Sequence, residues 1–218
     1  MMFRNLDQAG QELAARVQQA AGGTALADAI VLGLPPGGVV VGAAVAQSLG
    51  AELDALVVHR ITAPGRPGVV IGAMAEQDPA RLDRRALHLL GLTEQQLAPE
   101  VARGRAELRR QEARYRQGRP LAAVTGRPVI LVDDGLTVGI TAYAALRHLR
   151  RAHPARLVLA TPVCARDAAA VVLPVLDELV CLHEPWHLGK VADWYQDFHQ
   201  LSQHEVRQAL DPATTTVG

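Results

Sequence analysis

The chain contains 218 residues, of which 22 are acidic and 22 are lysine or arginine, so its formal net charge is zero. A neutral chain has no overall attraction for nucleic acids or membrane surfaces, and we expect neither as a partner. Apolar residues make up 49% of the sequence but aromatic residues only 3%, so Ala, Val and Leu must fill the core. This composition is typical of α/β proteins with Val-rich parallel strands.

Two further observations concern the cellular setting. The two cysteines, Cys164 and Cys181, are too few for a disulfide framework, and both lie in apolar runs, so we expect buried thiols. The N-terminal residues lack the apolar segment of a signal peptide, and no run of about 20 apolar residues predicts a membrane span. We therefore expect a cytoplasmic protein.

Five short apolar runs predict the strands. They are continuous rather than alternating, as expected for strands that are covered on both faces. In chain order they are Ala29–Leu34, Ala55–Arg60, Pro128–Val132, Leu157–Val163 and Glu178–His183.

Helical segments follow most of these strands. The first begins with a glycine pair and is expected to end at Gly50. The second begins near Gly139, and a third, over Ala165–Leu176, is expected to end at Pro174. Strands that alternate with helices predict a doubly wound α/β fold with a mainly parallel five-stranded sheet, whose ligands bind beyond the carboxyl ends of the strands.

The second of these helices is amphipathic. Four apolar residues repeat with the spacing of one buried helical face, and the side opposite is expected to be a solvent-exposed basic face. The apolar set is Ala142, Ala145, Leu146 and Leu149; the opposite set is Tyr143, Arg147, Arg150 and Arg151.

Residues 61–127 contain no strong candidate for a parallel strand. We expect a turn at Ala63–Gly68, a hairpin or edge strand at Val69–Met74, and a helix within residues 93–120 that begins with a Thr93–Gln96 capping box and restarts at Pro99. The many arginines of residues 103–119 predict a solvated face, or alternatively one or two side chains folded over an anionic ligand. We expect one domain, 1–218, in which segments 61–127 and 184–218 supply a small lobe or hood.

The sequence VILVDDGLTVGIT, from Val129 to Thr141, places two acids directly after a strand. Burying adjacent carboxylates is costly unless a cation or hydroxyl donors face them, and ribose hydroxyls are such donors. The following small residues lead into a helix whose N-terminus favours a phosphate group. The simpler alternative is an ordinary capped connection between a strand and a helix.

This stretch resembles the phosphoribosyl-pyrophosphate (PRPP) binding motif of type I phosphoribosyltransferases. The resemblance implies that Asp133 and Asp134 hold the ribose hydroxyls and form the catalytic centre, while Thr137 through Thr141 cradle the 5′-phosphate. The substrate-binding residues implied in this way are Asp133, Asp134, Gly135, Thr137, Val138, Gly139, Ile140 and Thr141. It also implies Mg²⁺, which would bridge PRPP oxygens and waters rather than need a protein cage.

A second loop, GLPPGG, follows the first predicted strand. A glycine pair lets the backbone approach pyrophosphate closely, and by resemblance this is the family's pyrophosphate loop. We assign to it Pro35, Pro36, Gly37 and Gly38, with Arg60 as an added positive charge or, alternatively, an ordinary surface arginine.

Three positions depart from the family pattern. Pro36 stands where many relatives have arginine, and Val138 stands where a phosphate-binding threonine is usual. Thr137 occupies the position of the aspartate base of hypoxanthine–guanine enzymes; threonine cannot serve as a base near neutral pH, so that substrate is not expected.

The C-terminal tail contains three of the seven aromatic residues: Trp194, Tyr195 and Phe198. The tail resembles the WYxDF segment of a bacterial group of predicted phosphoribosyltransferases, as do residues 63–68 and 113–120. These aromatic side chains either form a hood over a flat base or anchor the tail to the core. His183 and His187 have loosely metal-like spacing, but Pro185 interrupts the segment and we expect no zinc there.

We therefore predict an enzyme of nucleotide metabolism that transfers phosphoribosyl from PRPP to a nitrogen of a base or amine. The alternative is a non-catalytic PRPP or nucleotide sensor on the same fold, which Pro36 and Val138 favour. Another Rossmann-like nucleotide binder is disfavoured because the sequence lacks GxGxxG and GxxxxGK[ST] motifs. The acceptor and the oligomeric state stay open, with a homo-oligomer as one option.

Overall fold

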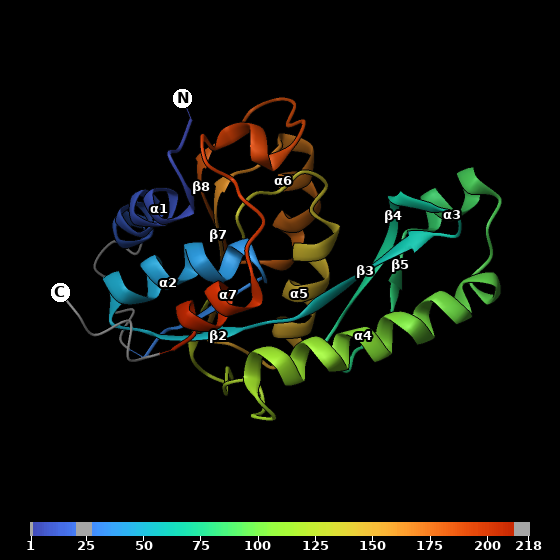
Figure 1. Cartoon of the computed structure of the whole chain (residues 1–218), viewed down its shortest axis with the longest axis horizontal. Helices are drawn as coiled ribbons and strands as arrows, with labels where there is room; N and C mark the ends of the chain where they lie inside the picture. Colours follow the sequence, from blue (N-terminus) through green and yellow to red (C-terminus); the bar gives the residue numbers. More distant parts are fainter. Residues whose placement is uncertain (1, 21–27, 212–218) are drawn as a thin grey trace.

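The computed structural model describes residues 2–20 and 28–211. Its centre is a five-stranded parallel sheet with strand order β2-β1-β6-β7-β8 (Figure 1). The strands are β1 Ile30–Gly33, β2 Glu52–Ala55, β6 Pro128–Val132, β7 Arg156–Val163 and β8 Glu178–His183. The doubly wound α/β fold predicted from the sequence is confirmed. In the described residues no helix is both long and apolar enough to cross a membrane.

Alternate side chains of the strands face opposite layers of helices. Ile30, Leu32 and Leu131 belong to a core with helices α5 and α6, whereas Val31 and Ile130 belong to a core with α1 and α2. The two pairs of helices thus cover the two faces of the sheet (Figure 1). Their bounds are α1 Leu6–Ala20, α2 Gly37–Leu49, α5 Ile140–Arg151 and α6 Arg166–Val172.

The helix ends largely follow the sequence prediction. Helix α2 ends at the left-handed Gly50, as predicted, and its backbone N–H caps the last turn. Helix α6 ends at Val172, earlier than predicted, and a 3₁₀ turn, Leu173–Val175, contains Pro174. Helix α1 was not predicted, although residues such as Leu6, Leu13 and Val17 give it a clear buried face.

A second, antiparallel sheet builds an arm that projects from the body (Figure 1). Its elements are β3 Val58–Ala63, β4 Arg66–Ala75, β5 Arg81–Leu82, α3 Arg84–Leu90, the 3₁₀ turn Gln95–Leu97 and α4 Ala98–Arg116. The predicted strand Ala55–Arg60 was wrong, because this apolar run spans two sheets. Its first residue ends β2, and Arg60 lies on β3.

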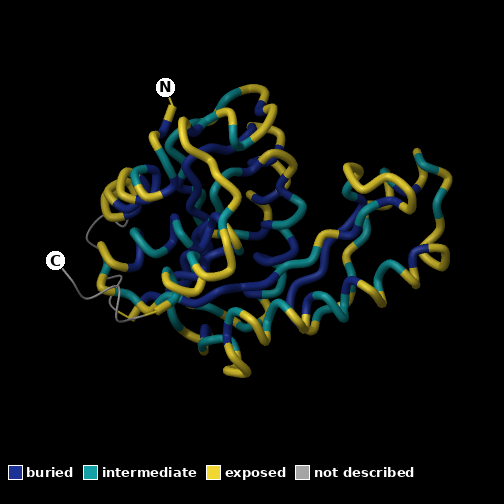
Figure 2. The backbone as a smooth tube through the Cα atoms, in the orientation of Figure 1, coloured by how far each residue is buried: buried dark blue, intermediate teal, exposed yellow. Residues whose placement is uncertain are grey.

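The arm has a core of its own. Ile61, Ile71 and Met74 from the hairpin pack with Leu97 and Leu108. Figure 2 shows that burial continues along the β3–β4 hairpin from the body into the arm. The predicted turn between these strands and the capping box are confirmed: the Thr93 amide donates to Gln96 Oε1 over 2.8 Å, and the Gln96 amide donates to Thr93 Oγ1 over 3.3 Å.

A buried ion pair joins α4 to the end of the β3–β4 hairpin, and a further bond from Arg116 reaches the body at Ala55. The Arg116 guanidinium donates twice to the Glu76 carboxylate, at 2.7 Å each, and once to the Ala55 carbonyl at 3.3 Å. The predicted solvated face does not include Arg116, whose exposure is 4%. The exposed face predicted for α5 is likewise partly covered, since Arg147 Nε is buried.

Residues 191–210 pack mainly on the body, and helix α7 also meets Tyr115 near the end of α4. The 3₁₀ turn Val191–Trp194 is followed by helix α7, Gln203–Ala209, which Ser202 and Glu205 cap reciprocally. Val206 of α7 is buried against Val39 and Ala55. The tail therefore returns to the first turn of α2 and the end of β2.

A second glutamate, Glu112, lies beside the buried ion pair. Its side chain is 12% exposed, and its Oε1 atom lies 3.9 Å from Arg116 Nη2. Burial, and then the charge of Glu76, raise the pKa of Glu112 to about 7. The protonated Glu112 carboxyl group stabilises the folded protein at pH values below its pKa in the unfolded chain. This stabilisation is lost as pH rises through about 7. We expect Glu112→Gln to raise Tm by about 2–4 °C at pH 8 and by less at pH 5, measured by thermal unfolding.

The matched control is Glu107→Gln on the same helix. A hydrogen bond from Arg110 lowers the pKa of Glu107, so its removal should not stabilise the protein at pH 8. Equal gains for both variants would contradict the assignment to Glu112.

Candidate functional site

The two acids lie directly after β6, where β6 and its neighbour β1 end side by side and β7 continues to Val163. Strand β6 ends at Val132, whose register partners are Gly33 of β1 and Ala160 of β7. The Asp133 amide donates to the Ala160 carbonyl over 3.2 Å and so continues the sheet by one bond. The sheet therefore presents both carboxyl groups at its carboxyl edge, where doubly wound folds bind ligands.

The glycine loop after β1 lies directly against the acids. A Cβ atom on Gly37 would overlap the Asp134 carboxylate, and one on Gly38 would lie 2.5 Å from the Val132 carbonyl oxygen. Only a residue without a side chain allows this approach. The peptide bond between Pro35 and Pro36 is cis, and α2 begins at Gly37. The structure thus brings together the two loops that the sequence singled out.

Both acids hold protons more tightly than ordinary aspartates. Burial, and then the charge of Asp134, raise the pKa of Asp133 well above its usual value. Burial also raises the pKa of Asp134. The positive charge of Arg60 opposes the shift in both without reversing it. A cation or hydroxyl donors at this turn would relieve the repulsion between the two carboxylates.

Arg60 approaches this turn from the arm. It is exposed on β3 and does not belong to the parallel sheet, although its charge acts on both aspartates. The sequence assigned Arg60 to the pyrophosphate loop as the end of a strand in the main sheet; the structure places it instead within β3 of the antiparallel sheet.

The loop after the acids leads into helix α5. The Leu136 amide donates to Val163 and its carbonyl accepts from Ala165, both at 2.9 Å, so the loop is fastened to the end of β7. Gly139 has a φ of 78°, and an added Cβ would lie 2.8 Å from the Ala168 carbonyl. Both facts require glycine there. Thr137 and Val138 are exposed, and Ile140 and Thr141 open the helix.

A residue from the tail, which the sequence alone did not assign, also contacts the turn. The Tyr195 hydroxyl donates to the Asp134 carbonyl over 2.7 Å. A Cβ on Gly135 would lie 2.7 Å from a methyl of Val191, so this side chain covers the glycine. The aromatic cluster of the tail was the available signal, and the anchoring interpretation applies to Tyr195, which is 3% exposed.

The two cysteines take no part in the acid turn in any described contact of their side chains. Cys164 is buried and pairs with Leu136 across an isolated bridge, while Cys181 is half-buried; both are free thiols. Within the described residues, no group of three or more His, Cys, Asp or Glu side chains is arranged to hold a metal ion.

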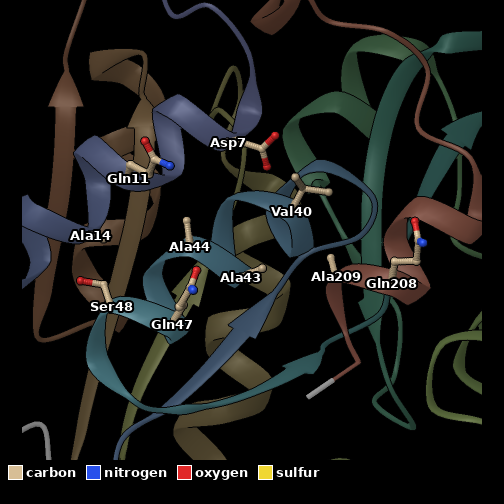
Figure 3. A pocket seen from close by; sticks show the side chains of 10 residues that line it. All are labelled: Asp7, Gln11, Ala14, Val40, Ala43, Ala44, Gln47, Ser48, Gln208 and Ala209. Atoms are coloured by element: carbon tan, nitrogen blue, oxygen red, sulfur yellow. The ribbon is translucent and has the colours of Figure 1, made fainter. Parts of the chain in front are cut away.

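A separate groove of about 630 Å³ runs between α1, α2 and α7 (Figure 3). Alanine and amide side chains dominate its lining, and among the described residues that line it Asp7 alone carries a charge. None of the candidate site residues lines it, so we do not assign the groove to the chemistry of the acid turn.

Comparisons with known proteins identify the family. A family model described as "Phosphoribosyl transferase domain" matches residues 3–187. The chain is 37% identical over 213 residues to the Mycobacterium tuberculosis protein named "Putative phosphoribosyl transferase Rv0571c", in a match that covers 97% of this chain and 47% of that protein. The chain thus spans about half the length of the curated relatives it matches.

Solved structures give the same result. The crystal structure of TT1426 from Thermus thermophilus superposes with a TM-score of 0.79 and 38% identity, over 96% of this chain and 98% of that one. The AQ2163 protein of Aquifex aeolicus, at 10% identity and a TM-score of 0.51 over 82% and 74% of the two chains, shares the fold. The chain belongs to the phosphoribosyl transferase domain family, as the Val129–Thr141 motif predicted.

The protonation of the acid turn makes a prediction for the ligand-free protein. Because the folded-state pKa of Asp133 is raised, its contribution to stability is lost as pH rises through that pKa. We expect Asp133→Asn to raise Tm at pH 8 by several degrees, with a smaller gain near pH 4, measured by thermal unfolding. Asp167→Asn, which removes an exposed acid from α6, serves as control and should change Tm far less. A loss of stability at pH 8 in Asp133→Asn would contradict the assigned protonation.

The contact between the glycine loop and the acid turn leads to a second prediction. Gly37→Ala must displace the Asp134 carboxylate or the start of α2, and we expect it to lower Tm by several degrees. Gly68→Ala is the matched control, because a Cβ there meets no atom within 4 Å and φ is not positive. Equal Tm values for the two variants would show that the loops are not in contact.

Proposed function

We propose that this chain is a PRPP-dependent phosphoribosyltransferase, which transfers the phosphoribosyl group to a nitrogen of a base or amine and releases pyrophosphate. One observation carries the proposal: the Asp133–Asp134 turn and the Gly37–Gly38 loop meet at the carboxyl edge of the parallel sheet. Family membership supports the same reaction class. Such an activity would belong to nucleotide metabolism.

The acids and the loop after them suit the ribose 5-phosphate part of PRPP. Asp133 and Asp134 would accept hydrogen bonds from the two ribose hydroxyls, each worth roughly 1.5–3 kcal/mol when the acceptor is charged. The backbone of Gly135 and residues 137–141 would surround the 5′-phosphate, with Thr137 and Thr141 adding hydroxyl groups. The N-terminus of the 12-residue helix α5 favours the negative charge.

The glycine loop suits the leaving group. The first backbone N–H groups of α2 have no partner within the helix and would bind the pyrophosphate oxygens, while Gly37 and Gly38 let the start of the helix lie against the acid turn. Pro35 and Pro36 shape the loop but offer no N–H donor. Arg60 would supply the positive charge that Pro36 lacks, from the arm side of the site.

The donor set fits magnesium held mainly by the substrate. Two adjacent carboxylates are oxygen ligands of the type that Mg²⁺ prefers, and the ion would take its other ligands from PRPP and water. When bound, magnesium would neutralise charge on the pyrophosphate group.

In the reaction, the acceptor nitrogen attacks the anomeric carbon while the bond from that carbon to pyrophosphate breaks. The transition state has oxocarbenium character, so positive charge grows on the sugar ring. The acids would fix the ring and the glycine loop would hold the departing oxygens, so most of the rate gain comes from positioning and charge stabilisation. None of the described residues stands out as a general base for the acceptor.

A sensor that binds PRPP or a nucleotide without turnover is the second candidate. Pro36 removes the usual basic side chain from the pyrophosphate loop, and Val138, 65% exposed, offers no hydroxyl to the phosphate. Both departures weaken contacts with the ligand rather than remove the site. The proposal therefore needs one test of binding and one of turnover.

The binding test uses the acids. Wild-type protein should bind Mg·PRPP in isothermal titration calorimetry, and Asp133→Asn and Asp134→Asn should each weaken binding by about ten-fold or more, because a charged acceptor is lost. Asp167→Asn should bind like the wild type. Unchanged affinity in both site variants would contradict the assigned role, and no binding by the wild type at millimolar PRPP would remove PRPP as the ligand.

The turnover test measures pyrophosphate release from Mg·PRPP with a panel of bases and amines. Release with at least one acceptor, abolished in Asp134→Asn, supports the transferase. Silence across the panel with binding intact supports the sensor.

A further inference from the structure

The C-terminal segment 191–198 lies over the acid turn. The Phe3 amide donates to the Trp194 carbonyl and the Gln196 amide donates to the Phe3 carbonyl, both at 2.8 Å, so an N-terminal residue holds this segment in place. The Phe3 and Tyr195 rings pack with their centroids 5.4 Å apart. Phe3 therefore holds the segment on one side, and on the other side the Tyr195 hydroxyl donates to the Asp134 carbonyl.

Tyr195 is built to act as a hydrogen-bond donor. Its side chain is 3% exposed and also packs on Phe198, with ring centroids 5.0 Å apart. Burial, and then the charges of Asp134 and Asp133, raise the pKa of the Tyr195 phenol, so the hydroxyl keeps its proton at any ordinary pH. A protonated phenol held at 2.7 Å can only donate to the carbonyl oxygen that it faces.

The carbonyl that accepts this bond has a particular place in the site. It belongs to the peptide group between Asp134 and Gly135, which joins the second acid to the phosphate loop. On one side of this peptide the Asp134 carboxylate lies against Gly37, and on the other Val191 covers Gly135. This one peptide group therefore links the acid that lies against Gly37 to the loop that Val191 covers.

We propose that Tyr195 is a positioning residue for PRPP: its hydroxyl fixes the Asp134–Gly135 peptide so that the acid and the phosphate loop face one ligand together. This inference rests on the proposed function, and it assigns to the tail a role in sugar phosphate binding. The Tyr195 hydroxyl bonds to the Asp134 carbonyl and makes no described hydrogen bond to the pyrophosphate loop, so its effect should fall mainly on ligands that carry the ribose 5-phosphate part.

The test compares Tyr195→Phe with Tyr115→Phe. The first removes only the hydroxyl and keeps the ring packing on Phe3 and Phe198. The second makes the same change at a half-buried tyrosine of α4. Affinities for Mg·PRPP and for Mg·pyrophosphate are measured by titration calorimetry at 25 °C, where circular dichroism shows each variant to be folded.

We expect Tyr195→Phe to weaken Mg·PRPP binding about five-fold, as loss of one buried hydrogen bond implies, and to leave Mg·pyrophosphate binding within about two-fold. Tyr115→Phe should change neither affinity. Amide hydrogen exchange of a peptide covering residues 133–141 should be faster in Tyr195→Phe alone, and this measurement needs no ligand.

Each other outcome has a distinct meaning. Wild-type binding of Mg·PRPP with unchanged affinity in Tyr195→Phe overturns the inference and leaves the proposed function standing. Equal losses of affinity for Mg·PRPP and Mg·pyrophosphate in Tyr195→Phe also overturn the inference, since they indicate general damage to the site. No binding by the wild type removes the proposed function, and the inference with it.

Discussion

The site depends on one close contact, in which the Asp134 carboxylate lies against the backbone of Gly37. The contact exists because β1 and β6 are neighbours in a parallel sheet, so the chain leaves both strands at the same edge. Without a side chain at Gly37 or Gly38, the two loops share one small volume. An acidic turn and a glycine loop that begins a helix are thereby placed within reach of a single ligand that carries both hydroxyls and phosphates.

The same close packing that forms the site lowers the stability of the ligand-free protein. The packing that brings the loops together also dehydrates two adjacent carboxyl groups and raises the pKa of both. Hydrogen bonds from the sheet, the bonds that fasten the loop after the acids to β7, and the hydroxyl of Tyr195 hold the turn in place despite this repulsion. A second buried arrangement, the Arg116–Glu76 pair, holds the arm from which Arg60 acts on the same turn.

Sequence reasoning succeeded where a pattern was local. The strands Pro128–Val132 and Glu178–His183 have the predicted bounds, because each is an uninterrupted apolar run between clear breaks. It failed at Ala55–Arg60, where an equally apolar run crosses from one sheet to another, and at Arg116, whose burial depends on a glutamate 40 residues away. The candidate loops were found from their residue types. The contact between these loops depends on strand order. The contact of Tyr195 with the acid turn depends on a hydrogen bond between residues 61 positions apart, which no short motif encodes.

The most direct measurement is a crystal structure of the protein with Mg·PRPP bound. We expect the ribose hydroxyls on the carboxylates of Asp133 and Asp134, the 5′-phosphate within the loop that ends at Thr141, and the pyrophosphate group at Gly37 and Gly38. PRPP bound elsewhere, for example in the groove between α1, α2 and α7, with the acid turn empty, would contradict this assignment.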